Sequence, residues 1–239
     1  MLNLYESPVL RDITKPVIRP GGFELTDRGV TCCGLVENTR VLDIGCGTGA
    51  AVDYLRRRHN LNAMGIDLSA VLLQEGARTH RGTPLMRGRA EQLPVSGACF
   101  GAVLCECMLS LCANPHHVLQ EMWRVVMPGG YMIQTDLYSR EPAAFGSAGA
   151  HSIRCCLQRA VDRATVEVRV AAAGFEQILW EDHTALLRQL AAQLVWNYGS
   201  LDAFWAAVAG PDAAQSLQQG QGGGCRRPGY YLLVARKIA

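Results

Sequence analysis

Short apolar runs alternate along the middle of the chain with stretches whose apolar residues recur every three or four positions. The apolar runs predict strands at residues 40–44, 62–67, 84–88, 101–106 and 131–136. The periodic stretches between them predict helices at residues 50–59, 69–80 and 115–126. Strands that alternate with helices are typical of β-α-β units, so this part of the chain predicts a mostly parallel sheet with helices on both faces.

Further elements are predicted on either side of this core. Residues 21–36 predict a helix that covers one side of the domain, residues 164–184 a helix that leads into a strand, and residues 228–237 a final strand. No evident crossover helix directly joins the last two strands, so we expect them to pair antiparallel. The predicted fold is a Rossmann-like, doubly wound α/β domain with a mostly parallel seven-stranded sheet and an antiparallel last strand.

Two segments do not follow the alternation and predict helical insertions. Residues 137–161 are rich in small side chains, and residues 183–227 begin as an amphipathic helix and end in a Gln- and Gly-rich stretch that predicts a mobile loop. The chain has 239 residues, 49% of them hydrophobic, which suffices for a buried core. We therefore expect a single domain over 1–239, with an N-terminal helical cover at 1–35 and a core at 36–136.

Composition and charge narrow the classes of partner. Charged residues make up 18% of the chain and the net charge is +2, without the basic excess of a nucleic-acid-binding protein. No apolar stretch reaches the ~18 residues of a membrane span, and the N-terminus lacks the pattern of a signal peptide. The ten cysteines are interpreted as mostly reduced and buried. We therefore expect a cytoplasmic protein that binds neither nucleic acid nor membrane.

A glycine-rich turn after the first core strand fits two nucleotide-binding fingerprints. The spacing of Gly45, Gly47 and Ala50 matches G-x-G-x-x-A, the dinucleotide motif. Including Asp43 and Gly49 gives D-x-G-x-G-x-G instead. An acid just before the glycines repels a pyrophosphate and suits a ligand with an ammonium or sulfonium charge. A nicotinamide oxidoreductase is therefore disfavoured, and it would also need a second, substrate-binding domain.

Several further motifs occur in the order found in a known family. They are VLDIGCGTG at 41–49, GIDLS at 65–69, AEQLPVSGACFGAVLC at 90–105 and LQEMWRVVMPGGYMI at 119–133. Together they resemble class I S-adenosylmethionine-dependent methyltransferases, especially the small-molecule branch that includes ubiquinone and menaquinone biosynthesis methyltransferases. The resemblance covers roughly residues 36–136, and the terminal GYYLLVARK resembles the last strand of that family. It implies S-adenosylmethionine as the cofactor and a small molecule as the methyl acceptor.

The resemblance also implies roles for individual residues. The implied cofactor-binding residues are Asp43, Gly45, Gly47, Asp67, Leu68, Ala90, Glu91 and Cys105. In that arrangement Gly45 and Gly47 pass under the methionine part of the cofactor, and Asp43 organises its amino group. Asp67 binds the ribose, and Leu68 packs on the adenine.

The adenine end contains one departure from the family pattern. Ala90 and Glu91 match the loop that meets the adenine edge, but Arg89 stands where the family often has aspartate. Cys105 lies at the end of the fourth predicted strand, where backbone carbonyls commonly face the cofactor. Tyr5 is expected to fold over the cofactor, as amino-terminal segments do in relatives.

The implied reaction is an in-line displacement at a sulfonium methyl, to which a protein contributes mainly orientation and desolvation. An oxygen or nitrogen acceptor benefits from a base, whereas a thiolate or an activated carbon needs none. Glu106 is the candidate base at the end of the fourth strand, with a solvated strand-end acid as its structural alternative. Tyr138 and His151 are candidate acceptor-side residues, the first just beyond the fifth strand and the second within the insertion at 137–161.

Two alternatives to this function stay open. One is a thiophilic, arsenite-like acceptor, because soft thiolates bind such metalloids and several cysteines lie outside the core strands, namely Cys32, Cys33, Cys155, Cys156 and Cys225. The other is a non-catalytic protein that binds S-adenosylmethionine, since Arg89 alters the adenine loop. No C-x-x-C pair has zinc spacing, so no metal site is expected. The sequence leaves the oligomeric state open.

Overall fold

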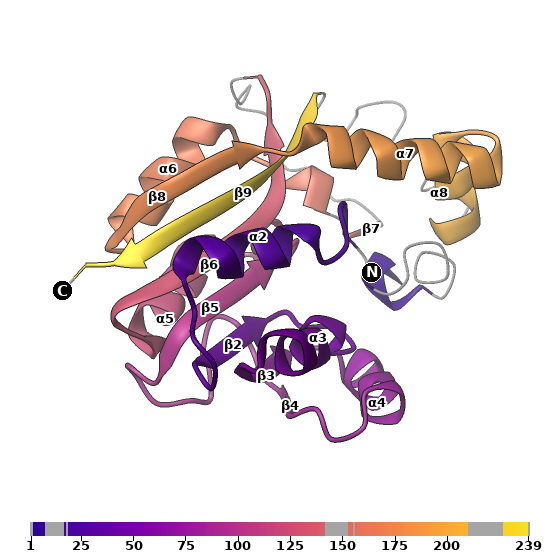
Figure 1. Cartoon of the computed structure of the whole chain (residues 1–239). Coiled ribbons are helices and arrows are strands. Elements are labelled where there is room, and N and C mark those ends of the chain that lie inside the picture. Colours follow the sequence, from indigo (N-terminus) through magenta and orange to yellow (C-terminus); the bar gives the residue numbers. More distant parts are fainter. Residues whose placement is uncertain are drawn as a thin grey trace.

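The computed structural model describes residues 2–7, 17, 19–141, 153–154, 156–209 and 227–238. Seven strands form its main sheet (Figure 1). Their spatial order is β4 (Leu85–Arg87), β3 (Asn62–Asp67), β2 (Arg40–Ile44), β5 (Phe100–Glu106), β6 (Val126–Ser139), β9 (Pro228–Lys237) and β8 (Phe175–Asp182). The predicted seven-stranded α/β sheet is confirmed.

Strand β9 runs antiparallel to both of its neighbours, β6 and β8. The pairs from β4 through β6 are all parallel. The prediction of an antiparallel last strand is therefore confirmed. Because parallel strands end at the same edge of a sheet, the carboxyl ends of β2, β3, β5 and β6 lie together.

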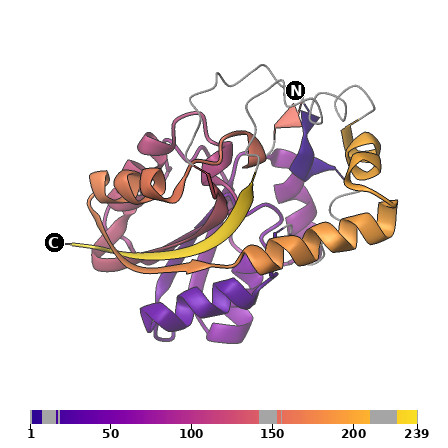
Figure 2. The same ribbon diagram turned by 90° about the horizontal axis from the view of Figure 1, so that it is seen from above.

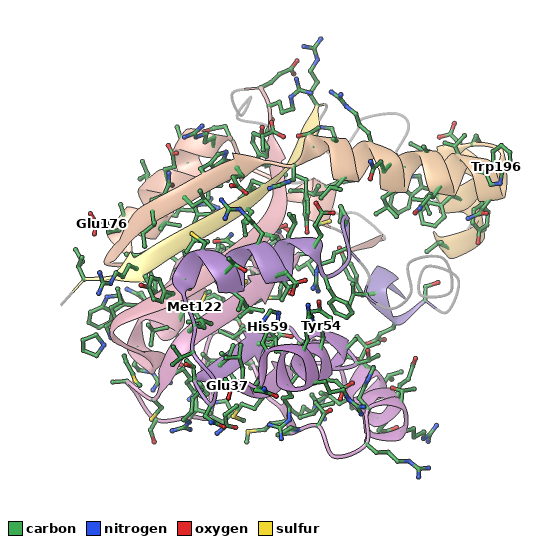
Figure 3. All side chains as sticks on the ribbon, in the orientation of Figure 1. Glu37, Tyr54, His59, Met122, Glu176 and Trp196 are labelled. Atoms are coloured by element: carbon green, nitrogen blue, oxygen red, sulfur yellow. The ribbon has the colours of Figure 1, made fainter. Side chains whose placement is uncertain are left out.

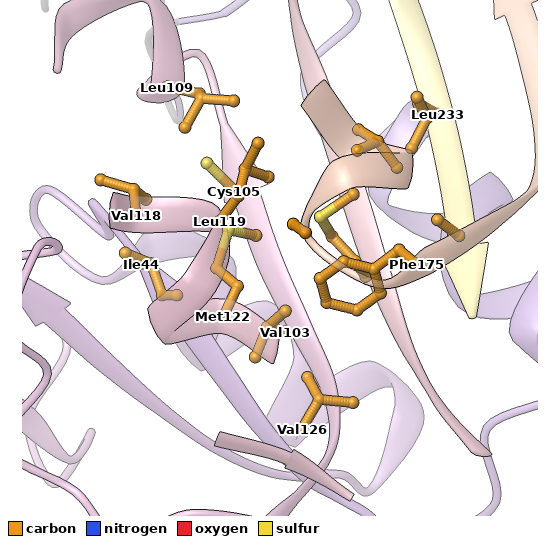
Figure 4. Close-up of a cluster of buried hydrophobic side chains, with 14 of the residues drawn as sticks. Ile44, Val103, Cys105, Leu109, Val118, Leu119, Met122, Val126, Phe175 and Leu233 are labelled. Carbon is orange, nitrogen blue, oxygen red and sulfur yellow. The ribbon is translucent and has the colours of Figure 1, made fainter. Parts of the chain in front are cut away.

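Helices cover both faces of the sheet (Figures 1 and 2). On one face lie α2 (Glu24–Cys33) and α3 (Ala50–His59), and on the other α5 (Pro115–Val125) and α6 (Arg163–Ala172). Alternate strand residues serve the two layers, since successive side chains point to opposite faces. Leu104 packs with α2 and α3, whereas Val103 and Cys105 pack with α5 and α6. Figure 4 shows part of the second cluster, around Met122 and Phe175.

Polar residues cap several helices and fix where they begin. Ser69 accepts from the backbone of Leu72 at the start of α4 (Ala70–Thr79). Asn114 caps α5 in the same way, and Pro115 follows as its first residue, where the missing N–H leaves no bond unmade. These caps explain why the helix starts predicted at 69 and 115 agree with the structure to within one residue.

The remaining elements lie around the edge where the parallel strands end. They are β1 (Leu2–Asn3), η1 (Leu4–Glu6), η2 (Leu109–Leu111), β7 (Ile153–Arg154), η3 (Cys156–Gln158), α7 (Thr184–Tyr198) and α8 (Leu201–Ala209). β1 and β7 pair as a small parallel sheet. α7 leaves the end of β8 and runs away from the main sheet, with α8 at its far end (Figure 2). Trp196, 88% exposed, lies near that far end (Figure 3). Within the described ranges, no helix combines the length and apolar character needed to cross a membrane.

The fifth core strand is longer than predicted. β6 continues through Ser139, so residues 137–139 belong to the sheet and not to the insertion expected at 137–161. The reason is pairing with β9, in which Leu137 faces Tyr230 and Ser139 faces Pro228. Most of that insertion, at 142–152 and 155, lies outside the described residues, as does the Gln- and Gly-rich stretch at 210–226.

Candidate functional site

The carboxyl ends of β2, β3 and β5 surround a cavity of about 650 Å³. From β2 the chain moves outward to β3 and β4 and then returns to β5 on the other side of β2, so the cavity lies at a topological switch point. Its walls include Tyr5, Arg19, Gly45, Gly47, Asp67, Leu68, Ser69, Ala90, Glu91, Glu106, Cys107, Met108 and Cys112.

The glycine-rich turn between β2 and α3 forms part of this wall. Gly45 (φ 78°), Gly47 (φ 57°) and Gly49 (φ 79°) adopt left-handed backbone conformations that favour glycine. A Cβ added at Gly45 would collide with the side chain of Met108. α3 begins directly after the turn, at Ala50, so its unpaired N–H groups lie at the turn. The turn is therefore a backbone cradle that a ligand can approach closely.

Asp67 ends β3 and is held in place by backbone donors. The Gly47 N–H donates to its Oδ2 at 2.8 Å, and the Ser69 N–H donates to its Oδ1 at 2.7 Å. A carboxylate has about four acceptor sites, so each oxygen can still accept from a ligand hydroxyl. The Ser69 hydroxyl donates to Glu6 at 2.7 Å, and Tyr5 beside it forms part of the cavity wall. The N-terminal segment thus contributes to the cavity, as expected for Tyr5.

The loop after β4 forms the rim beside Asp67. Ala90 and Glu91 line the cavity together with Leu68. Leu68 is 53% exposed, so it is not part of the hydrophobic core. Arg89 lies 3.6 Å from Glu91 in an ion pair. The charge of Arg89, the residue that departs from the family pattern, is therefore paired with Glu91 in the same loop.

An ion pair occupies the opposite side of the cavity, at the end of β5. The Arg19 Nη2 lies 3.0 Å from the Glu106 Oε2, and both side chains are nearly buried. The Thr26 hydroxyl donates to the Glu106 Oε1 at 3.0 Å and accepts from Arg19 at 2.6 Å. Burial raises the pKa of Glu106, and the charge of Arg19 and the hydrogen bond from Thr26 oppose that rise.

Comparison with known proteins identifies the family. A sequence family described as a methyltransferase domain matches residues 42–134. Over 200 residues the chain is 30% identical to a malonyl-[acyl-carrier protein] O-methyltransferase of Herminiimonas arsenicoxydans, with 81% of this chain and 68% of that protein covered. The chain belongs to the class I S-adenosylmethionine-dependent methyltransferases. S-adenosylmethionine is the cofactor of this family, which confirms the second of the two fingerprints.

Other relatives of this chain match over different lengths. It is 35% identical over 108 residues to a fatty-acid O-methyltransferase of Mycolicibacterium smegmatis, covering 44% of this chain and 39% of that protein. It also resembles the crystal structure of the [4+2]-cyclase SpnF, with 25% identity, a TM-score of 0.77, and coverage of 99% of this chain and 93% of that one. The aligned part spans about two fifths of the length of the first curated relatives that it matches.

The cavity brings together most of the residues expected at the cofactor site. Gly45, Gly47, Asp67 and Leu68 line it, as do residues 90–91. Their roles toward the cofactor stay predictions. Glu106 also lines the cavity, but as the buried partner of Arg19 and not as a solvated strand-end acid.

Three of the expected site residues have side chains that do not line the cavity. Asp43 is buried and absent from the cavity wall; burial and the nearby Glu106 raise its pKa to about 8, with Arg19 opposing and Asp67 adding to the rise. The Cys105 side chain packs in the core with α5, because strand alternation turns it away from the residues on either side. The prediction for Cys105 concerned the backbone carbonyl at the strand end, and that role stays a prediction.

Tyr138 is the third of these residues. Its hydroxyl donates to Asp182 at 2.8 Å, and its ring packs edge-on against Trp180 and Tyr231. Tyr138 therefore packs within the β6–β9–β8 part of the sheet and does not line the cavity. His151 lies outside the described residues, so its acceptor-side role stays a prediction.

The cysteines at the cavity are not those singled out in the sequence. Cys32 and Cys33 lie at the end of α2, and Cys33 is buried in the core, which raises the pKa of its thiol to about 12. Cys155 and Cys225 are outside the described residues. The cavity wall instead carries other sulfur atoms, those of Cys46, Cys107, Met108 and Cys112. No group of metal-ligating side chains occurs within the described part of the chain.

Sequence reasoning also missed Arg19, Cys107 and Met108. Cys107 follows β5 with a left-handed backbone (φ 53°), and its thiol lies 3.2 Å from the Tyr230 hydroxyl. The position directly after a parallel strand is a signal that could have found Cys107 and Met108. Arg19 has no such signal, because its partners lie on elements that only the fold brings to it.

Proposed function

We propose that this protein transfers a methyl group from S-adenosylmethionine to a small-molecule acceptor bound in the same cavity. The observation that carries the proposal is the Asp67 carboxylate, which two backbone N–H groups hold at the cavity beside a turn that has no side chains at Gly45 and Gly47. This arrangement fits a nucleoside, because a carboxylate accepts from ribose hydroxyls and a bare backbone permits close approach.

The described residues fit the cofactor along the whole cavity. Asp67 would hold the ribose, Leu68 and Ala90 would enclose the adenine, and Gly45 would pass beneath the sulfur-bearing chain. When bound, the cofactor supplies an electrophilic methyl group on a sulfonium sulfur. The acidic side chains on the wall suit that positive charge. Met108 and Leu111 exclude water from the β5 side, which strengthens electrostatic interactions inside the cavity.

We further propose that the acceptor atom is a carboxylate oxygen. Two observations support this class of acceptor. The relatives matched above are named as O-methyltransferases of a fatty acid and of malonyl-[acyl-carrier protein]. In addition, the best-placed candidate base, Glu106, is ion-paired with Arg19. An acceptor that is already ionised at neutral pH needs no base.

The test is a methyl-transfer assay with S-adenosylmethionine that carries a labelled methyl group. Medium- and long-chain fatty acids would be compared with their alcohols of equal length. The proposal expects label in the methyl ester and none in an ether. Label in the ether alone would contradict a carboxylate acceptor, and absence of transfer to acids, alcohols, thiols and arsenite would contradict the enzyme function.

A second candidate function is cyclisation of a bound small molecule without methyl transfer. The observation that favours it is the similarity to the [4+2]-cyclase SpnF over nearly the whole of both chains. The apolar side chains of Met108, Leu111 and Ala113 give the cavity a wall that suits an apolar substrate. Mass spectrometry separates the two functions, because methylation adds a methyl group to the acceptor and cyclisation leaves its mass unchanged.

We also propose a single domain that works in the cytoplasm. The thiols of Cys33, Cys46, Cys105 and Cys107 form no disulfide, which supports a reducing compartment, and a shared sheet supports one domain.

A further inference from the structure

The short helix η2 and its flanking residues form the cavity wall between the glycine turn and the acceptor-side insertion. Met108, just before η2, packs against Gly45, because a Cβ added at Gly45 would collide with the Met108 side chain. Cys112, just after η2, lines the cavity, and its carbonyl accepts from the Arg159 side chain at 2.8 Å. η2 also packs against η3, which lies in the segment expected to bind the acceptor. The position of η2 therefore decides how an acceptor would lie relative to the glycine turn.

The carboxylate of Asp136 ties η2 to the sheet. Asp136 lies on β6 and is 2% exposed. The Ser110 hydroxyl donates to its Oδ1 at 2.7 Å, and the Ser110 N–H donates to its Oδ2 at 2.9 Å. The Leu137 N–H donates to the same Oδ1 at 2.8 Å. Asp136 thus holds the middle residue of η2 by both its backbone and its side chain.

The stability of the fold does not by itself explain this buried carboxylate. Burial raises the pKa of Asp136 to about 6, and the hydrogen bonds from Ser110 and Leu137 oppose that rise. Its contribution to stability is therefore present below about pH 4 and is lost as the pH rises through about 6. Buried carboxylates with a raised pKa are typical of functional sites. The placement of Ser110, and through it of η2, accounts for Asp136 better than a net gain in stability does.

We propose that Asp136 is a positioning residue for methyl transfer, which acts through Ser110 to hold η2 against the acceptor. The inference rests on the proposed function and deepens it. In the transfer, the acceptor oxygen bonds to the methyl carbon while the carbon–sulfur bond breaks and its electron pair stays on sulfur. A misplacement of about 1 Å lowers the rate of such an aligned step by about 100-fold. Asp136 does not line the cavity, so it acts through Met108 and Leu111, which do.

Asp136→Asn and Ser110→Ala release the wall to different degrees. In either orientation the asparagine NH₂ group faces a backbone N–H, that of Ser110 or that of Leu137, whereas Ser110→Ala removes only the hydroxyl donor. The assay uses methyl-labelled S-adenosylmethionine with dodecanoic acid, and dodecanol if only the alcohol is methylated. We expect kcat to fall about 10- to 100-fold in Asp136→Asn and about 2- to 10-fold in Ser110→Ala. The affinity for S-adenosylhomocysteine should be unchanged.

Two further variants separate positioning from a merely structural role. Asp182→Asn is the matched control, because Asp182 also accepts from a hydroxyl and a backbone N–H, those of Tyr138 and Thr184, and does not line the cavity. It should lower the free energy of unfolding and leave kcat unchanged. Ser110→Thr keeps the hydroxyl donor and should keep the kcat of the wild type.

Release of the wall is also measurable without an acceptor. Cys112 lies at the end of η2 and Cys46 on the glycine turn, and both line the cavity as partly buried thiols. Reaction with N-ethylmaleimide, followed by peptide mass spectrometry, gives the labelling rate of each thiol. Asp136→Asn should label Cys112 about 10-fold faster, because η2 opens locally, and Cys46 at the rate of the wild type.

The outcomes distinguish this inference from the proposed function. A wild type that methylates no acceptor contradicts the proposed function and, with it, the role in methyl transfer. If the wild type is active and Asp136→Asn and Ser110→Ala keep its kcat, the inference alone is wrong. Equal acceleration of labelling at Cys46 and Cys112 would also overturn it, since Asp136 would then stabilise the whole domain and not η2.

Discussion

Replacing Asp67 with asparagine removes one charge from the cavity and leaves the shape of the side chain unchanged. Both carboxylate oxygens accept backbone N–H groups, from Gly47 at 2.8 Å and from Ser69 at 2.7 Å. An asparagine has only one oxygen, so in either orientation its NH₂ group faces one of these donors. The substitution therefore weakens the turn as well as the contact with a bound ribose.

The magnitude follows from the bonds that are lost. A hydrogen bond to a charged acceptor contributes about 1.5–3 kcal/mol. In the absence of ligand, one such backbone bond is lost, and we expect the free energy of unfolding to fall by about 1–3 kcal/mol. Binding additionally loses the charge-assisted ribose contact, which predicts about 10- to 100-fold weaker affinity for S-adenosylhomocysteine.

Calorimetric titration of both proteins gives the affinity, and denaturation without ligand gives the stability. Asp53→Asn is the matched control, because Asp53 is also a carboxylate held by a neighbour, Arg57, on α3. It should leave the affinity unchanged. If Asp67→Asn is folded and binds S-adenosylhomocysteine as tightly as the wild type, Asp67 does not hold the ribose and the reasoning fails.

Three more substitutions test other parts of the structure. Gly45→Ala places a side chain at φ 78° and against Met108. It should lower the free energy of unfolding by at least about 1–2 kcal/mol and weaken S-adenosylhomocysteine binding. An unchanged affinity in calorimetric titration would contradict the role of the turn as a backbone cradle. Tyr138→Phe removes the hydrogen bond to Asp182. Denaturation should show that the free energy of unfolding falls by about 1 kcal/mol, with an unchanged affinity for S-adenosylhomocysteine. Weaker binding would show that Tyr138 contributes to the site. The Asp43 pKa of about 8 exceeds its ordinary 3.8, so its contribution to stability is present below about pH 4 and is lost as the pH rises through about 8. Asp43→Asn should therefore lose less stability between about pH 5 and pH 9 than the wild type in urea unfolding, and an equal loss would refute the raised pKa.

The sequence predicted the core elements well because their local signals agree with the fold. The strand at 40–44, the helix at 50–59 and the strand at 62–67 have the bounds that the structure shows. Apolar alternation, a glycine turn and a helix follow one another there without a competing signal. Residues 137–139 were misassigned because their strand pairing depends on residues 228–230, about 90 positions away.

Two physical causes decide how much of the site the sequence predicts. Alternation along the strand turns the Cys105 side chain, like that of Val103, toward α5, so the sequence contains the direction of this side chain. Arg19 depends on the packing of α2 against the sheet, which brings Thr26 and Arg19 to Glu106. No spacing in the sequence predicts the contact between Arg19 and Glu106.

The central claim is that the cavity at the ends of β2, β3 and β5 binds S-adenosylmethionine. Calorimetric titration of the reduced protein with S-adenosylhomocysteine, with NADH as the control, tests it most directly. We expect saturable binding of S-adenosylhomocysteine with one site per chain and no binding of NADH. Binding of NADH alone, or of neither ligand, would contradict the account.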